Sequence, residues 1–407
     1  MKTPSARHTS INKISRWSGL AILSTSLLIS ACSSDSDDDE PDLVQGEGVA
    51  IVATVAADYT SGAHASIQTG TPITVTENLA PTISDITVAA HGDYFYRIER
   101  FNSDNVTKFS FDAPATPIWQ FSTLDAGEEG SGNPQGMIFL NDNKAYIPRY
   151  GKNTLWIVNP SATSQEEFKI GEIDLSAYDS NGDIVEMSPA AIVGDKLFIA
   201  MQRLDPGYVP GDAYVAVIDT NTDTEINTGN NADFMGILLP LKNPTSIEAD
   251  ETGMLYVQSP GKYGFGGEPN EYSGGIATID PDTFETALLV DDGDADNHPF
   301  GQITGVEIVS SGKGYLIAQH GFGDSALHAF NPLTGVVDEQ ALSGLSGVNI
   351  SGLAADSNER LWVGTGASDT DSAAIRLIDS TSDSLIDAPI ELSLNPITIV
   401  FDSTLAP

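Results

Sequence analysis

Polar side chains follow several of the apolar stretches of this sequence, at the point where each stretch ends. We call them the rim residues, and they are Arg97, Arg100, Arg149, Tyr150, Gln202, Arg203, Gln258, Gln319 and His320. A guanidinium can hold a carboxylate or a phosphate through two parallel hydrogen bonds. The pattern therefore predicts a site for an anionic ligand. The alternative is that these side chains cap loops and pair with the abundant Asp and Glu.

Two of the segments that follow are longer than a hairpin requires, and both carry aromatic residues. They span residues 205–212 and 261–267 and contain Tyr208, Tyr263 and Phe265. Binding residues concentrate on long loops that a rigid scaffold holds. We expect these rings either to line a pocket for a flat ligand or to fold back onto the rim residues.

Two acidic clusters place oxygen atoms at alternate positions, as calcium-binding loops do. The first contains Asp179, Asn181 and Asp183, and the second contains Asp292, Asp294 and Asp296. Neither has the sixth-position Gly and twelfth-position Glu of the helix-loop-helix calcium motif. Calcium binding is one interpretation and a solvated acidic loop is the other. The sequence indicates no other cofactor.

Familiar hydrolase motifs do not occur in this sequence. It contains neither H-E-x-x-H nor G-x-S-x-G, and its one cysteine, Cys32, lies in an N-terminal segment. The sequence therefore favours binding over catalysis.

The elements that would position the rim residues are short apolar strands that recur along the chain. A typical unit has an opening strand, a second strand rich in Tyr, Leu, Ile and Val, a variable loop, and a third strand ending near Asp or Asn. The opening strands begin near Ser84, Pro134, Pro189, Pro244, Thr304, Ser351 and Pro396. Their spacing of roughly 45 to 60 residues is close to that of β-propeller blades.

The two ends of this repeat array complement each other. Residues 49–55 read as a second strand that lacks an opening strand, and residues 395–401 read as an opening strand with nothing after it. Pairing them completes a ring, which hides the edges of the first and last sheets. We therefore predict an all-β fold over residues 49–407: a seven-bladed β-propeller of four-stranded antiparallel blades, closed by the C-terminal strand. Two stacked β-sandwiches are the alternative, but no linker divides residues 84–400.

The N-terminal segment has the composition of a targeting sequence. Basic residues precede an apolar run at 19–29, and small residues lead into Cys32, so residues 1–31 are predicted to be a lipoprotein signal peptide. Cys32 would carry the lipid, and Ser33 after it favours the outer membrane. An ordinary secretory peptide with a stray cysteine is the alternative. Residues 32–48 are predicted to be an acidic, disordered tether.

The charge balance limits the class of partner. The chain has 18 basic and 57 acidic residues, a formal net charge of −39. Nucleic acids and anionic lipid surfaces demand the opposite sign, so neither is expected to bind.

The blade pattern, with Leu255-Tyr256-Val257 followed by Ile279-Asp280-Pro281-Asp282-Thr283, resembles YncE-like, YVTN-type seven-bladed β-propellers. The resemblance covers roughly residues 49–401, although strict YVTN tetrads are replaced by variants such as Leu361-Trp362-Val363. That group includes lipidated members of bacterial envelopes, some of which assist nutrient uptake beside transporter barrels.

The resemblance implies a lipoprotein of the cell envelope, anchored to the outer membrane and facing either the periplasm or the surface. We expect a binding module that takes a small ligand, or a partner such as an outer-membrane transporter, on its loop-rich face. Tyr263 would join the rim residues there. A metal-dependent hydrolase or lactonase acting through a central opening is the alternative, and a scaffold in an envelope complex is another.

Overall fold

The structure, a computed structural model, describes residues 48–179, 184–264, 269–321 and 323–407. Five positions named above lie outside these residues: Cys32, Ser33, Asn181, Asp183 and Phe265. The predicted signal peptide and nearly all of the predicted tether lie outside them too. Within the described part of the chain, no helix is long and apolar enough to cross a membrane.

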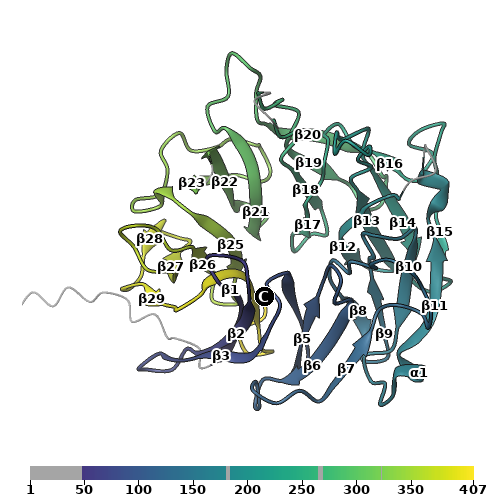
Figure 1. The fold of residues 1–407 in the computed structure, drawn as a ribbon. Helices are drawn as coiled ribbons and strands as arrows, with labels where there is room; N and C mark the ends of the chain where they lie inside the picture. The colour runs from purple at the N-terminus through teal and green to yellow at the C-terminus, as the bar shows by residue number, and fades with distance from the viewer. Residues whose placement is uncertain (1–47, 180–183, 265–268, 322) are drawn as a thin grey trace, which may run out of the picture. The chain divides into compact units, whose positions relative to one another are not determined.

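Seven antiparallel sheets, called blades 1 to 7, account for nearly all of the secondary structure. Figure 1 shows them arranged radially around a central axis. From the axis outward, blade 1 has β30 (Asn395–Phe401), β1 (Val49–Val55), β2 (Gly62–Gln68) and β3 (Thr74–Thr82); blade 2 has β4 (Ile86–His91), β5 (Tyr94–Glu99), β6 (Asn105–Ser110) and β7 (Trp119–Ser122); blade 3 has β8 (Ile138–Asn141), β9 (Lys144–Ile147), β10 (Thr154–Val158) and β11 (Lys169–Asp174).

Blades 4 and 7 each carry a fifth, two-residue strand. Blade 4 has β12 (Met187–Val193), β13 (Lys196–Met201), β14 (Tyr214–Asp219), β15 (Thr224–Glu225) and β16 (Ile237–Leu238); blade 5 has β17 (Ser246–Ala249), β18 (Leu255–Ser259), β19 (Gly275–Ile279) and β20 (Thr286–Asp291); blade 6 has β21 (Gln302–Ser310), β22 (Lys313–Gly321), β23 (Asp324–Phe330) and β24 (Ser346–Val348); blade 7 has β25 (Ile350–Ala355), β26 (Arg360–Thr365), β27 (Ala374–Asp379), β28 (Ser384–Leu385) and β29 (Ile390–Glu391). The helical segments are α1 (Gln165–Phe168) and η1 (Ser176–Tyr178).

The C-terminal strand closes the ring, as predicted. β30 pairs antiparallel with β1, so that Ala50 lies opposite Phe401 and Ala53 opposite Thr398. The first strand of blade 1 therefore comes from one end of the described chain and its other three strands from the opposite end. The predicted seven-bladed, all-β propeller of four-stranded antiparallel blades is confirmed.

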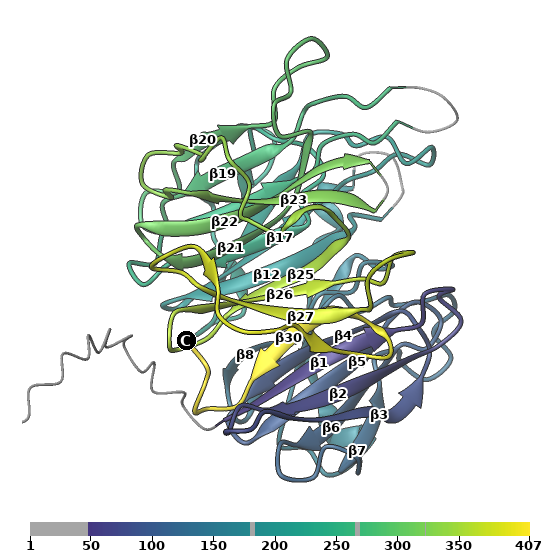
Figure 2. The same cartoon turned by 90° about the vertical axis from the view of Figure 1, so that its left-hand side faces the viewer.

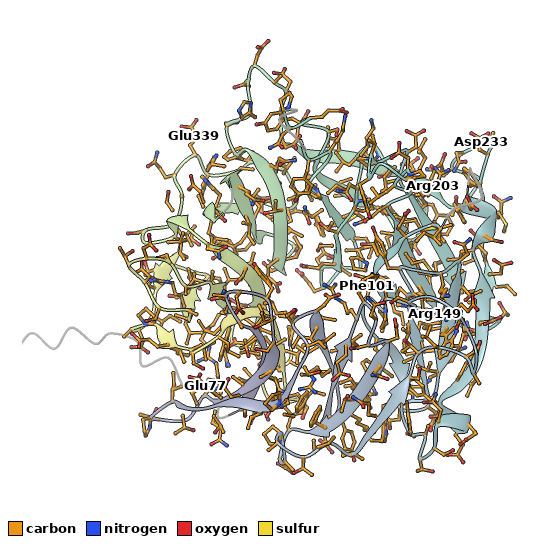
Figure 3. All side chains as sticks on the ribbon, viewed as in Figure 1. Glu77, Phe101, Arg149, Arg203, Asp233 and Glu339 are labelled. Atoms are coloured by element: carbon orange, nitrogen blue, oxygen red, sulfur yellow. The ribbon has the colours of Figure 1, made fainter. Side chains whose placement is uncertain are left out.

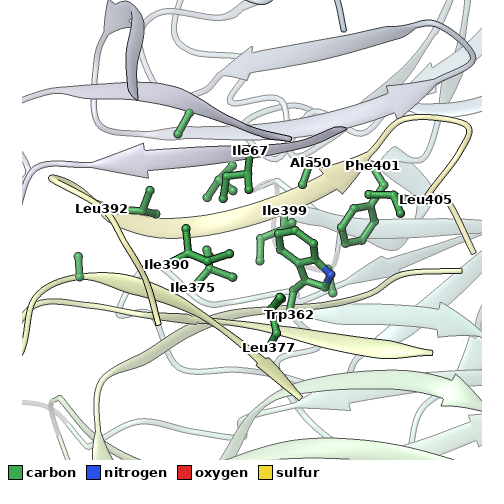
Figure 4. Packing of buried hydrophobic residues seen from close by; sticks show 14 residues of the cluster. Ala50, Ile67, Trp362, Ile375, Leu377, Ile390, Leu392, Ile399, Phe401 and Leu405 are labelled. Carbon is green, nitrogen blue, oxygen red and sulfur yellow. The ribbon is translucent and has the colours of Figure 1, made fainter. Parts of the chain in front are cut away.

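The core lies between the blades and not within any one of them. Seven buried apolar clusters correspond to the seven interfaces between neighbouring blades. Because a blade is packed on both faces, its middle strands are apolar on both, as in β18, where every residue is buried. At the closing interface, Phe401 meets Trp362 of blade 7 edge to face, with ring centroids 5.3 Å apart (Figure 4).

Antiparallel connectivity puts the loops on two faces of the ring. The loops after the second strands, such as 56–61, 100–104, 202–213 and 366–373, share one face with the connections between blades. We call this the loop-rich face. The chain enters β1 and leaves β30 on the other face, where the Val49 N–H donates to Asp402 Oδ2 at 3.0 Å. The edge-on view in Figure 2 shows the C-terminus on the opposite side from the long loops.

Candidate functional site

The structure buries Arg97, although the sequence pattern predicts it at an exposed rim. It lies inside β5 and is buried, where its guanidinium forms an ion pair with Glu99 at 2.8 Å. It also donates to the Ala80 carbonyl and, at 3.2 Å, to His64 Nδ1. Burial lowers the pKa of His64 to about 4, so the neutral ring accepts at Nδ1 and donates from Nε2 to the Pro114 carbonyl. Arg97 therefore joins blade 1 to blade 2.

Arg149 is likewise buried among protein partners. Its Nη1 donates to Glu128 Oε2 at 2.8 Å and to the Thr123 carbonyl at 3.2 Å. Nε donates to the Thr154 carbonyl, and the guanidinium lies 4.7 Å from the centre of the Trp156 ring. With only 2% of its surface exposed, Arg149 has no face left for a ligand.

Four further rim residues connect neighbouring blades through hydrogen bonds. Arg100 donates to Gln135, Tyr150 to Gln202, Gln202 to the Pro244 carbonyl, and Gln258 to the Ile303 carbonyl. These bonds join blade 2 to 3, 3 to 4, 4 to 5 and 5 to 6 in turn. Burial raises the pKa of Tyr150, which keeps its hydroxyl protonated as the donor. Most of the rim residues therefore connect neighbouring blades around the ring, because buried amides and hydroxyls need hydrogen-bond partners.

Arg203 faces a cavity but is held by backbone. It donates to the carbonyls of Tyr178 and Asp212, each at 2.8 Å, and lies 4.9 Å from the centre of the Tyr214 ring. The adjoining cavity of about 350 Å³ is lined in part by Asp179 and Ile184, and the residues between these two are not described by the structure. We therefore build no site on it.

The remaining rim residues do not converge. Gln319 donates to the Gly321 carbonyl at 3.3 Å within its own strand, β22, and His320 is exposed. Tyr263 is half-buried, and burial raises the pKa of its hydroxyl.

The second acidic cluster does not gather its oxygens around a common point, and two members of the first cluster lie outside the described residues. Asp292 is buried, its Oδ1 accepts the Gly274 N–H at 3.2 Å, and burial raises its pKa to about 7. Asp294 and Asp296 are exposed, and Asp294 Oδ1 accepts the backbone N–H of Asp296. Asp179 follows η1 at the edge of the undescribed segment. Within the described ranges, no three His, Cys, Asp or Glu side chains are placed to share a metal ion.

A cavity of about 370 Å³ opens on the loop-rich face where blades 1 and 2 meet the axis; we call it the mouth cavity. Thr87 of β4 and Thr398 of β30 lie at the innermost strands, and their hydroxyls are 3.2 Å apart. Arg100 and Asp85 line the same cavity, with Arg100 Nη2 2.6 Å from Asp85 Oδ1. Both members of this pair keep about a third of their side-chain surface exposed. Unlike Arg97, Arg100 is thus accessible to a ligand.

Two exposed aromatic rings accompany this pair. Tyr59, which lines the cavity, is 61% exposed, and Phe101, next to Arg100, is 56% exposed. The φ of Tyr59 is 57°, a left-handed value that costs non-glycine residues of order 1 kcal/mol. The Phe101 N–H is fixed by Asp85 Oδ2 at 3.2 Å. Figure 3 shows Phe101 close to the centre of the ring, with Arg149 and Arg203 farther out.

A second cavity, of about 700 Å³, opens on the face of the ring opposite the loop-rich face. Glu248 of β17 and Glu307 of β21 line it. Glu248 accepts the Ile308 N–H at 3.0 Å, and Glu307 accepts the Ala355 N–H at 2.7 Å, so each carboxylate reaches the next blade. Burial raises the pKa of Glu307 to about 7, and burial with the neighbouring Glu307 charge raises that of Glu248 well above its usual value. One of the two therefore keeps a proton near neutral pH.

No pattern in the sequence distinguishes Tyr59, Phe101 or the two glutamates from their neighbours. Each glutamate sits in an ordinary half-buried strand, Ser-Ile-Glu-Ala and Gly-Val-Glu-Ile, and only the ring brings them together. Tyr59 lies in a short loop that resembles a simple hairpin turn, so its exposure could not be read from the sequence.

Comparison with known proteins supports the fold. A family model described as "Two component regulator propeller" matches residues 344–367, which cover parts of blades 6 and 7. No curated protein matches the chain.

Solved structures with the same fold include the periplasmic gluconolactonase of Pseudomonas aeruginosa, at 13% identity and a TM-score of 0.58, covering 88% of this chain and 99% of that one. A candidate 6-phosphogluconolactonase of Bacteroides uniformis has 12% identity and a TM-score of 0.57, covering 88% and 100%. One of Bacteroides fragilis has 13% identity and a TM-score of 0.55, covering 91% and 99%. At this identity the likeness establishes the propeller fold alone.

Proposed function

We propose that this propeller is a binding module that takes a small polyhydroxylated ligand in the mouth cavity. The observation that carries the proposal is the pair of exposed rings, Tyr59 and Phe101, held beside an accessible Arg100–Asp85 ion pair. Aromatic rings that keep more than half of their surface exposed suit an amphipathic ligand that stacks on them. The ion pair offers both donors and an acceptor to neighbouring hydroxyls, and Thr87 and Thr398 add two hydroxyl groups deeper in the cavity.

The experiment is calorimetric titration of the purified protein with hexoses, sugar acids and sugar lactones. We expect at least one to bind, Tyr59→Ala to weaken its affinity roughly 10-fold, and Arg100→Gln to do so by a similar factor. The matched control is Tyr208→Ala, because Tyr208 is 73% exposed on the same face but belongs to blade 4. Binding that survives Tyr59→Ala and Arg100→Gln unchanged, or no binding by any member of the panel, would refute the proposal.

A lactonase is the second candidate function. The paired glutamates favour it, because a protonated carboxyl and a carboxylate can divide acid and base roles in adding water to a lactone carbonyl. The solved structures that are named as gluconolactonases have the same propeller fold, which could hold such a site. The lactones in the same panel test this function through the acid that ring opening releases. Release that Glu307→Gln abolishes would identify an enzyme, whereas ligand recovered unchanged would identify a binding module.

We further infer that Cys32 anchors the protein to the outer membrane. The small residues before Cys32 support this inference. We expect the protein to sediment with outer membranes and Cys32→Ser to move it to the soluble envelope fraction. An unchanged distribution of the Cys32→Ser protein would contradict lipid anchoring. We propose that a partner such as an outer-membrane transporter would contact the loop-rich face.

A further inference from the structure

Arg376 of β27 has a guanidinium nitrogen that donates to no partner among the residues that the structure describes. Its Nε is buried without a hydrogen-bond partner. The arginines that form ion pairs in the described part of the chain are Arg97, Arg100, Arg149 and Arg360. A buried donor without an acceptor lowers stability, and more so when it is charged. Arg376 as a whole is only half-buried and lines a cavity, so its other guanidinium nitrogens are the donors that a ligand would meet.

Strand geometry points this side chain toward blade 6. Ile375 and Leu377, on either side of it, pack in the cluster shared with blade 1, whereas Ile378 packs in the cluster shared with blade 6. Since side chains alternate along a strand, Arg376 lies on the same face as Ile378. It therefore faces the interface between blades 6 and 7, far from the blade 1–blade 2 interface that forms the mouth cavity.

A cavity of about 290 Å³ opens beside Arg376 on the loop-rich face. Thr365, Asn349 and the backbone of Gly366 line it together with Arg376. Its rim carries two carboxylates, Asp369 and Asp371, neither of which forms an ion pair with the guanidinium. Asp371 is partly engaged by the Thr370 hydroxyl at 2.8 Å, and Asp369 is exposed. The cavity thus presents a cation at its wall and anions at its rim.

We propose that this cavity binds a small zwitterion that carries a carboxylate and an ammonium group, as α-amino acids do. The carboxylate would take the vacant donors of Arg376, and the ammonium would lie against Asp369 and Asp371. A lone anion fits less well, because those carboxylates and the net charge of −39 oppose it. The volume lies at the lower end of the range for ligand pockets, which limits the ligand to a small molecule.

The test is calorimetric titration of the full-length protein with glycine, L-alanine and L-serine, and with acetate and methylammonium as single-charge probes. We expect an amino acid to bind at least 10-fold more tightly than either single-charge probe. Arg376→Gln should weaken amino-acid binding by roughly 10- to 100-fold, and Arg376→Lys by less, because lysine keeps the charge without the planar fork. Asp369→Asn with Asp371→Asn should remove the preference over acetate.

Lys242→Gln is the matched control, since Lys242 is a partly exposed cation of the same face and forms an ion pair with Glu271. It should leave amino-acid binding unchanged. Thermal unfolding shows whether each variant is folded. If the Arg376→Gln protein does not fold, the Arg376→Lys protein still tests the proposal. Acetate that binds as tightly as alanine, Arg376 variants that bind like the wild type, or no binding by any probe at millimolar concentration would each overturn the proposal. None of these outcomes affects the mouth cavity, whose ligands are titrated separately.

Discussion

Replacing Arg97 by Met should lower the free energy of unfolding by about 3–5 kcal/mol, because it leaves the Glu99 carboxylate charged and buried without its partner. Only 1% of Glu99 is exposed, and its remaining side-chain partners are Thr107 and Gln120. These neutral groups cannot compensate a buried charge. Urea-induced unfolding of the wild type and the variant measures the difference.

Two further variants distinguish this buried pair from a ligand site. Adding Glu99→Gln to Arg97→Met should restore much of the stability, since the amide keeps a hydrogen bond to Thr107 without a buried charge. Arg100→Gln, which breaks a partly exposed pair, should cost less than about 1 kcal/mol. An Arg97→Met protein that keeps full stability but loses ligand affinity would restore Arg97 to the ligand rim.

The sequence was sufficient for the architecture because the ring depends on features that are local in the chain. Asn395-Pro396 marks the start of the closing strand, and the apolar run after each such turn predicts the first strand of a blade. The split of blade 1 followed from counting strands, since residues 49–55 need a partner that only residues 395–401 can supply.

The contacts of the rim residues could not be predicted in the same way. Arg97 was placed beyond its strand, but β5 continues to Glu99, and alternation puts Arg97 with Phe95 on the face toward blade 1. His64 and Ala80, which then surround it, belong to a different blade. Whether an arginine serves a ligand or the fold depends on such neighbours, and spacing along one strand does not reveal them.

Because neighbours from other blades cannot be identified along one strand, the sequence also did not predict most residues of the candidate sites. Arg376 sits within the apolar strand Ala-Ile-Arg-Leu-Ile-Asp, where it resembles the solvent-facing residue of an ordinary strand. Its lack of a partner is visible only once the loop at 366–373 and blade 6 are in place. Arg100 was selected from the sequence and does line a cavity, although the aromatic residues beside it differ from those expected.

A disulfide between β1 and β30 should form spontaneously and stabilise the protein by up to about 5 kcal/mol, the second large effect expected here. Ala53 and Thr398 are cross-strand partners, and such pairs have Cα separations within the range that a disulfide spans. The link would close a loop containing nearly the whole propeller, which reduces the entropy of the unfolded chain. Part of this gain can be lost to strain at the new bond.

This disulfide also tests whether the ring is closed. The mouth cavity and the Arg376 cavity both depend on closure, because the closed ring places them on one face. The measurement is intramolecular cross-linking of Ala53→Cys/Thr398→Cys in a Cys32→Ser background, with Ala53→Cys/Ile399→Cys as the control one residue out of register. We predict one monomeric oxidised species, with a raised unfolding temperature, for the first pair and none for the control. Free thiols in both proteins, or cross-links only between molecules, would contradict the closed ring.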